Sequence, residues 1–270
     1  AAAINSGTLD MTKWARFQKS NLDLFFRGVE LLSSEENERF EFFDRWLNHL
    51  QESMPDLGKR LARVYEAGPE GFDEKTAAEL KVLIKHFDSY RILCATREAA
   101  GKTGSEEINR WLHLRWLEEN RKGEEITGNP HFLVGEPVLV TRNDYKMRLY
   151  NGDSGLILRV AVSDRAGKHT GEIMAVFPRG AGFVAYPPEA LRGQIESAWA
   201  STVHKAQGSE YDYIAIILPE VPVRTLTREL LYTAVTRARH SLIIVGKEDI
   251  LTVGVQQSTE RTSGLADILA

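Results

Sequence analysis

The sequence predicts an α/β fold built on a parallel sheet, and three stretches carry that prediction. Residues 213–218 and 241–246 are short apolar runs with the length and the isoleucine content of buried strands. A helix-like segment, residues 229–239, separates them. A third apolar run, residues 91–95, is followed by a helical pattern in the same way. Strands that alternate with helices are typical of parallel sheets, because parallel neighbours need a crossover connection.

Composition sets limits on the class of protein. A hydrophobic content of 43% and a charged content of 27% are ordinary for a globular protein with a substantial core. We find no run of about 18 apolar residues that would span a membrane, and no signal peptide. Cys94 is the one cysteine, so a disulfide framework is excluded and a reducing, cytoplasmic location is expected. The net charge of −4 argues against a surface coated in basic residues, but it leaves room for a local groove that binds nucleic acid.

Residues 1–88 are predicted to form a helix-rich N-terminal part of the domain. Phe40, Phe43, Trp46, Leu47 and Leu50 recur at steps of three and four, as one face of a helix requires. This aromatic stripe is interpreted as core packing, with a surface for a partner subunit as the alternative. The chain starts Ala-Ala-Ala-Ile-Asn without a methionine, and we expect it to be a segment of a longer protein.

Residues 89–131 contain a strand, a Gly101-Lys102-Thr103 string and a helix, an order that invites comparison with a P-loop. A P-loop also needs a glycine five residues before the Gly-Lys pair, because the loop must open its amides toward phosphate. Thr96 occupies that position, so we predict that this is not a P-loop. Thr103 and Glu106 have the spacing of a capping box for the helix that follows.

Residues 132–190 are predicted to form a small antiparallel β insert. The runs 134–143, 155–162, 172–177 and 182–186 have strand character, and Asn151-Gly152-Asp153 is a turn signal between the first two. Short strands joined by glycine turns favour a small barrel.

Two polar strings carry the chemistry. The first, residues 197–212, reads SAWASTVHKAQGSEYD, and the second, residues 229–239, reads ELLYTAVTRAR. Together they resemble motifs V and VI of superfamily 1 helicases, and their wording resembles the RecD family of exodeoxyribonuclease V alpha subunits. The Arg-Asn-Asp-Tyr string at 142–145, the Asn-Gly-Asp turn and the Thr-Glu-Arg-Thr-Ser-Gly-Leu phrase at 259–265 extend that resemblance. It implies a RecA-like second motor domain over 89–131 and 191–270, with an SH3-like insert at 132–190.

The resemblance implies a nucleotide site shared with a first motor domain. In such motors an arginine from the second domain stabilises charge on the transferring phosphoryl group. Arg237 matches this arginine finger, although an arginine there could also be a solvent-facing partner of a helix C-terminus. The other residues that match ATP-binding positions are Gln207, Gly208, Glu210 and Arg239. ATP and Mg²⁺ are the implied cofactors, with the P-loop and the metal ligands expected outside this chain; no metal site is predicted within it.

The resemblance also implies contacts to DNA and to partner subunits. Thr202 and His204 match residues that contact the backbone of a single strand, while Thr96, Arg97 and Asn109 match the surroundings of motif IV. The implied partners are single-stranded DNA, duplex DNA ends, and RecB-like and RecC-like subunits.

The function predicted on this basis is that of the C-terminal motor domain of an ATP-dependent 5′→3′ DNA helicase subunit in double-strand-break repair. The segment alone is expected to be inactive as an ATPase. Two alternatives remain open: a stand-alone RecD-type or relaxase-linked helicase domain, and a non-catalytic DNA-binding or scaffold module that kept the fold.

Overall fold

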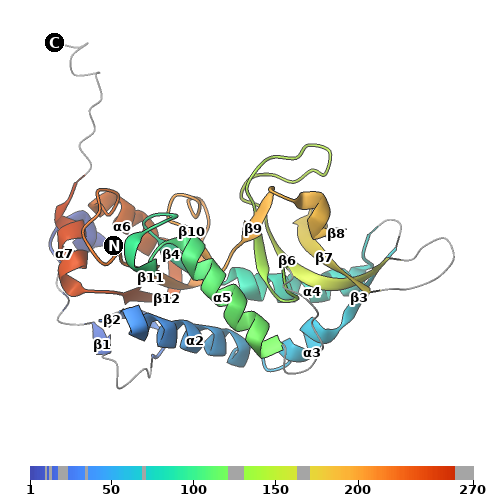
Figure 1. Ribbon diagram of the computed structural model, residues 1–270, viewed down its shortest axis with the longest axis horizontal. Helices are drawn as coiled ribbons and strands as arrows, with labels where there is room; N and C mark the ends of the chain where they lie inside the picture. The colour runs from blue at the N-terminus through green and yellow to red at the C-terminus, as the bar shows by residue number, and fades with distance from the viewer. Residues whose placement is uncertain are drawn as a thin grey trace, which may run out of the picture.

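The chain folds around two β-sheets that lie end to end (Figure 1). The computed structural model describes residues 1–9, 11, 14–17, 24–33, 36–68, 71–120, 131–162 and 171–258. The phrase at 259–265, which entered the resemblance above, lies outside these residues.

The first sheet is parallel and has the strand order β1-β2-β12-β11-β4-β10. Its strands are β1 (Ala15–Phe17), β2 (Gly28–Leu32), β12 (Ala238–Val245), β11 (Tyr211–Ile217), β4 (Tyr90–Cys94) and β10 (Ala200–Thr202). Every neighbouring pair runs in the same direction. The predicted parallel sheet is therefore confirmed, including the strands expected at 91–95, 213–218 and 241–246.

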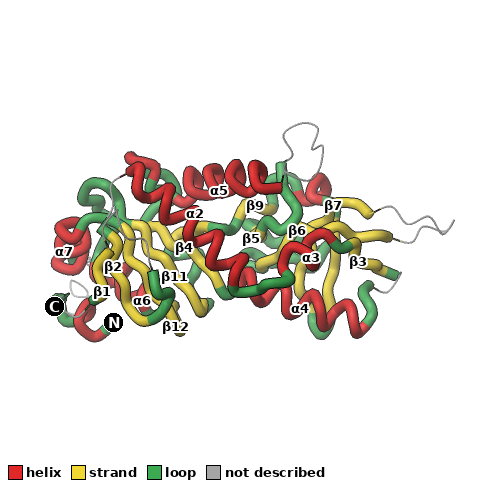
Figure 2. The backbone as a smooth tube through the Cα atoms, turned by 90° about the horizontal axis from the view of Figure 1, so that it is seen from below, coloured by secondary structure: helices red, strands yellow, loops and turns green. Residues whose placement is uncertain are grey.

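Helices cover both faces of this sheet, which explains the long apolar runs of its central strands β4, β11 and β12. Along β4 the side chains alternate: Ile92 and Cys94 join one hydrophobic cluster, and Leu93 joins the other. The first cluster takes in α2 (Glu36–Glu52), α4 (Glu74–Asp88) and α5 (Ser105–Asn120). The second takes in α1 (Ala2–Asn5), α6 (Arg228–Val235) and α7 (Glu248–Gln256). Figure 2 shows α2 lying over the parallel strands.

The second sheet is largely antiparallel, with the strand order β8-β7-β6-β5-β9. Its strands are β5 (Pro137–Val140), β6 (Ser154–Val162), β7 (Gly171–Arg179), β8 (Gly182–Tyr186) and β9 (Ile195–Ser197). A further strand, β3 (Val64–Ala67), pairs with β6 in parallel. Four of these strands fall within the predicted insert, whereas β9 and β3 come from outside it. Closure into an SH3-like barrel stays a prediction.

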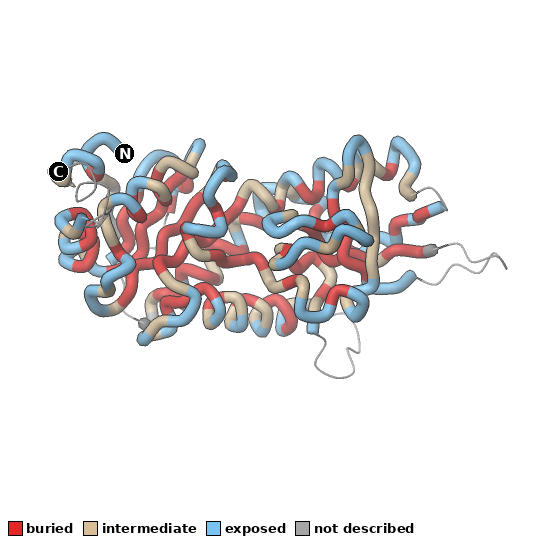
Figure 3. Tube along the Cα trace, turned by 90° about the horizontal axis from the view of Figure 1, so that it is seen from above, coloured by how far each residue is buried: buried red, intermediate tan, exposed pale blue. Residues whose placement is uncertain are grey.

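One hydrophobic cluster joins the two sheets. It contains Ile92 and Ala215 of the parallel sheet together with Leu158 and Val176 of the antiparallel sheet. Figure 3 shows buried residues, in red, through the interior of both halves of the molecule. The two sheets therefore share a core.

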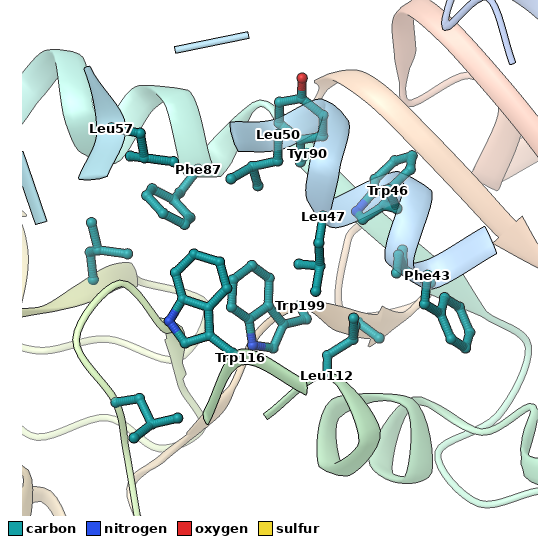
Figure 4. Close-up of a cluster of buried hydrophobic side chains, with 14 of the residues drawn as sticks. Phe43, Trp46, Leu47, Leu50, Leu57, Phe87, Tyr90, Leu112, Trp116 and Trp199 are labelled. Atoms are coloured by element: carbon teal, nitrogen blue, oxygen red, sulfur yellow. The ribbon is translucent and has the colours of Figure 1, made fainter. Parts of the chain in front are cut away.

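Aromatic side chains fill the middle of that shared core (Figure 4). Trp116 of α5 packs on Trp199 with ring centroids 5.3 Å apart, and Phe87 of α4 lies 6.1 Å from Trp199. Phe43, Trp46, Leu47 and Leu50 of α2 are buried in the same cluster. The interpretation of the aromatic stripe as core packing is confirmed.

Residues 1–88 contain strands as well as the expected helices: β1 and β2 belong to the parallel sheet, β3 joins the other, and α3 (Leu57–Ala62) is a short helix before β3. The structure corrects two expectations about elements. Thr103 does not cap α5: its hydroxyl donates to the carbonyl of Ala100, at the end of a 3₁₀ turn (Ala100–Lys102). Finally, α6 ends at Val235, so Arg237 lies in the connection to β12.

Candidate functional site

Residues 203–210 form a compact return loop between the edge strand β10 and the start of β11. Val203 and Ala206 anchor the loop in the hydrophobic cluster of the α6 face. Between these anchors, His204, Lys205 and Gln207 are exposed. Gly208 has φ +87°, a conformation that L side chains rarely adopt, so a glycine suits this position. The loop therefore presents a row of polar groups on a buried base.

Arg237 is held against this loop. Its guanidinium donates to the carbonyl of Thr233 at 3.2 Å, to the carbonyl of Ser209 at 3.2 Å and to the hydroxyl of Thr236 at 3.3 Å. No ion pair joins it to a carboxylate of the residues that the structure describes. The arginine is thus fixed in direction while its charge stays unneutralised by the described part of the chain.

Glu210 and Arg239 form an ion pair beside Arg237, with Nη2 and Oε2 2.8 Å apart. Register explains the proximity, because Tyr211 at the start of β11 lies opposite Ala238 at the start of β12. Both side chains are more than half exposed, which makes the pair weak and open to exchange. The predicted ATP-binding residues thus gather at the amino-terminal ends of β11 and β12, from positions 207–210 and 237–239.

The residues predicted to contact DNA lie around the other ends of the strands. Thr202 pairs in register with Cys94, so Thr96 and Thr202 lie at or just beyond the carboxyl ends of the neighbouring strands β4 and β10. Arg97 is exposed and pairs with Glu106 at 3.1 Å. His204 follows in the return loop. The loop 203–210 therefore connects the two predicted groups of residues.

Asn109 has a structural task that its sequence position did not reveal. Its amide nitrogen donates to the carbonyls of Ser197 and Ala200 at 2.9 Å, and its oxygen accepts from the amide of Ala200 at 2.8 Å. Both amide hydrogens are thus engaged. Asn109 ties α5 to the start of β10, and a donor contact from it to DNA would require these bonds to break.

A cavity of about 300 Å³ lies between α5 and the antiparallel sheet. Arg97, Asn109 and Lys205 line it, together with Glu136, which the sequence analysis missed. The Glu136 side chain is 1% exposed, and its Oε2 accepts from His113 Nδ1 at 2.9 Å and from the Leu133 amide at 3.0 Å. A glutamate between glycine and proline has the pattern of an exposed turn, so no sequence signal marked it.

A second cavity of about 290 Å³ lies under the return loop. Its lining includes Asp88, Arg91, Ser209 and Glu210. Burial raises the pKa of Asp88, and Arg91 at 3.7 Å and Ser154 oppose that rise. Arg91 itself is buried and donates to the carbonyl of Ala198, which fixes the start of β4 to the chain before β10.

The Gly101-Lys102 turn packs against an acidic residue. A Cβ at Gly101, whose φ is +70°, would come within 2.2 Å of Glu220 Cγ. Arg39, which is buried, pairs with Glu220 and donates to the Gly101 carbonyl at 2.8 Å. This turn is therefore part of a tight contact between α2 and the chain after β11.

Within the described residues, no cluster of three His, Cys, Asp or Glu side chains could hold a metal ion. No helix in the described ranges is long and apolar enough to cross a membrane.

Comparison with known proteins assigns the class first. Residues 197–245, which include the return loop, Arg237 and Arg239, match the UvrD-like helicase C-terminal domain. Among solved structures, the Pif1 helicase from Candida albicans superposes with a TM-score of 0.41 at 13% identity, covering 88% of this chain and 59% of that one. That likeness is too low to support an argument about fold.

Within this class the chain is a RecD-like C-terminal helicase segment. It is 37% identical over 235 residues to the RecBCD enzyme subunit RecD of Mycobacterium tuberculosis, covering 84% of this chain and 36% of the relative. It is 30% identical to the RecD subunit of Haemophilus influenzae, covering 77% of this chain and 29% of that protein. The chain thus spans about a third of the length of these curated relatives.

Proposed function

We propose that this chain is the C-terminal motor domain of an ATP-dependent 5′→3′ DNA helicase subunit of a RecBCD-type complex. Similarity to several RecD subunits and the UvrD-like helicase match support the helicase motor. The specific complex is inferred from the relatives' names, and RecB-like and RecC-like subunits are its proposed partners. Single strands and duplex ends are the proposed DNA substrates.

The observation that carries the proposal is the state of Arg237. Its three described acceptors are neutral oxygens, so its charge is available to an incoming anion. A guanidinium stays charged at any working pH and offers a planar fork to phosphate oxygens. Its neighbour Arg239 is by contrast paired with Glu210. Arg237 is therefore the better candidate for the arginine finger.

The other residues at the amino-terminal ends of β11 and β12 have supporting roles in the proposal. Open space around Gly208 lets a phosphate of ATP approach the backbone, and the exposed side-chain amide of Gln207 can donate to it. Glu210 can accept from a ribose hydroxyl once its ion pair with Arg239 has opened. A bound ATP–Mg²⁺ group supplies the phosphoryl group to be transferred, with its P-loop and metal ligands contributed from outside this chain. Arg237 stabilises negative charge as that transfer proceeds. The chain alone is expected not to turn over ATP.

At the opposite ends of the strands, Thr96, Arg97, Thr202 and His204 are proposed to contact the backbone of a single strand. Hydroxyl, guanidinium and imidazole groups donate to phosphate without reading sequence. The proposed role of Asn109 changes: it positions β10 and holds Thr202 in place.

Replacing Arg237 with alanine tests the proposal. In the intact helicase, Arg237→Ala is expected to lower the single-strand-stimulated ATPase rate by roughly 10³-fold, because the charge developing in the transition state loses its partner. Steady-state turnover with saturating single-stranded DNA measures this. Arg237→Lys keeps the charge without the fork, and is expected to recover only part of the activity.

The matched control is Arg60→Ala, which removes a partly exposed arginine of α3 that pairs with Asp56. It should leave turnover unchanged. DNA affinity, measured by fluorescence anisotropy, should be retained in both alanine variants. Wild-type turnover in Arg237→Ala would show that the motif is structural here, and would favour the scaffold alternative.

A further inference from the structure

Glu136, which lines the cavity beside α5, is a buried carboxylate with one unused oxygen. Its side chain is 1% exposed, and Oε2 already accepts two hydrogen bonds, from His113 Nδ1 and the Leu133 amide. Oε1 has no hydrogen-bond partner among the residues that the structure describes. A buried acceptor left without a donor is costly, and a charged acceptor more so. The site therefore favours a ligand that brings an N–H group.

The surroundings of Glu136 define what kind of ligand could bring it. The cavity of about 300 Å³ has the size of a small-molecule pocket, and its lining includes the phenyl ring of Phe132 and the imidazoles of His113 and His131. Arg97, Arg110 and Lys205 line the same cavity, which gives it cationic groups. Each of these cations is held in an ion pair that is at least partly exposed, with Glu106, Glu107 and Glu196 respectively. Such pairs are worth little and can be exchanged for phosphate.

An aromatic ring, exchangeable cations and a deep acceptor match the three parts of a nucleotide in a single strand. The ring stacks on the base, the cations hold the phosphates, and the acceptor reads the edge of the base. A metal ion fits less well, because no group of three metal-binding side chains occurs within the described ranges. Lys205, next to His204, places the cavity beside the proposed DNA path.

We infer that this cavity takes one unstacked base of the bound single strand and that Glu136 Oε1 accepts from its exocyclic amine. Cytosine, adenine and guanine carry such an amine, whereas thymine offers only its ring N3–H, so the site is expected to favour the amine-bearing bases over thymine. Glu136 is then a specificity-determining residue, and His113 is a positioning residue that holds its other oxygen. This inference rests on the proposed single-strand binding and adds a base preference to it.

An isosteric substitution tests the inference by reversing the polarity of the site. In Glu136→Gln the amide oxygen can keep both bonds of Oε2, from His113 and Leu133, and the NH₂ group then takes the place of Oε1. The site then offers a donor, which suits the O4 carbonyl of thymine. Wild-type intact protein is expected to bind oligo(dC) about fivefold or more tighter than oligo(dT), and Glu136→Gln is expected to prefer oligo(dT).

Glu106→Gln is the matched control, since it removes the same charge from an exposed position on the same cavity. It should change affinity for both oligonucleotides alike and keep their ratio. Equal wild-type affinity for the two, or an unchanged ratio in Glu136→Gln, overturns the base preference while single-strand binding stands. Absence of binding to either oligonucleotide by the wild type overturns the proposed function and this inference with it.

Discussion

His49 is a histidine whose pKa is lowered by its packing against the hydrophobic core. Its ring stacks on Phe26 with centroids 3.6 Å apart, and its Nδ1 lies 2.8 Å from the hydroxyl of Tyr90. Burial, assisted by the positive charge of Arg45, lowers the pKa of His49 to about 4. Burial also lowers the pKa of His86 nearby. Both histidines are thus favoured in their neutral form in the folded protein.

A pH dependence of stability follows from these shifts. In the unfolded chain His49 becomes protonated near pH 6.5, whereas in the folded chain its pKa is about 4. Between these values the unfolded state binds more protons, so the free energy of unfolding should fall as the pH drops, by ~2 kcal/mol after allowance for solvent screening. Urea unfolding at pH 7 and pH 4.5 measures this.

The variant His49→Gln keeps a hydrogen-bond partner for Tyr90 but does not titrate. It should lose stability at pH 7 yet show a shallower decline toward pH 4.5. An equally steep decline in this variant would assign the pH dependence to other groups.

At the scale of elements, Asn109 is the link between α5 and the short strand β10. Three hydrogen bonds from one side chain hold the backbone around Ala200, which is buried. A strand of three residues at the edge of a sheet has few bonds of its own. The position of Thr202 and of the return loop therefore depends on α5.

Asn109→Ala should consequently lower the free energy of unfolding by ~2 kcal/mol, because it leaves a buried amide without an acceptor. Thermal unfolding followed by circular dichroism measures the loss. Asn48→Ala, at an exposed position of α2, is the control and should stay within about 0.5 kcal/mol of wild type. If both substitutions cost the same, the three bonds contribute no net stability.

Elements with a local signature were predictable, and elements defined by distant partners were not. The runs at 91–95, 213–218 and 241–246 are apolar enough to be recognised as strands. β2 was hidden because Glu30, which is buried at its centre, interrupts the apolar pattern; backbone amides of Phe25 and Arg27 satisfy this carboxylate. β3 has four residues and exists through its pairing with β6, far along the chain.

The candidate site divides in the same way. Motif strings pointed to Arg237, Gln207 and the return loop as candidates, because their spacing along the chain is short and specific. Glu136 escaped notice because its hydrogen-bond partner His113 lies on α5, and no local pattern connects the two positions. The task of Asn109 was missed for the same reason.

At the scale of the whole molecule, the shared core should make the two sheets unfold together. Trp199 packs between Phe87 and Trp116 at the junction. Trp199→Ala is expected to lower the free energy of unfolding by ~4 kcal/mol and to leave a single transition. Hydrogen exchange of amides in β7 and β11 across a urea titration tests this.

Leu114→Ala provides the comparison, because Leu114 lies on the same helix as Trp116 and is 46% exposed. It should change stability by no more than about 0.5 kcal/mol. Loss of protection in β7 at a lower urea concentration than in β11 would mean that the sheets are independent units.

The pairing of β3 with β6 has a consequence for how such proteins diverge. Gly171 lies where an added Cβ would come within 3.0 Å of the Val64 side chain, so a larger residue at 171 requires a smaller one at 64. The two positions lie far apart in the sequence, with β4 and α5 of the motor part between them. Grafting residues 132–190 from a relative would therefore change position 171 without the matching residue at position 64. Evolution should favour paired changes at positions 64 and 171 over replacement of the whole insert.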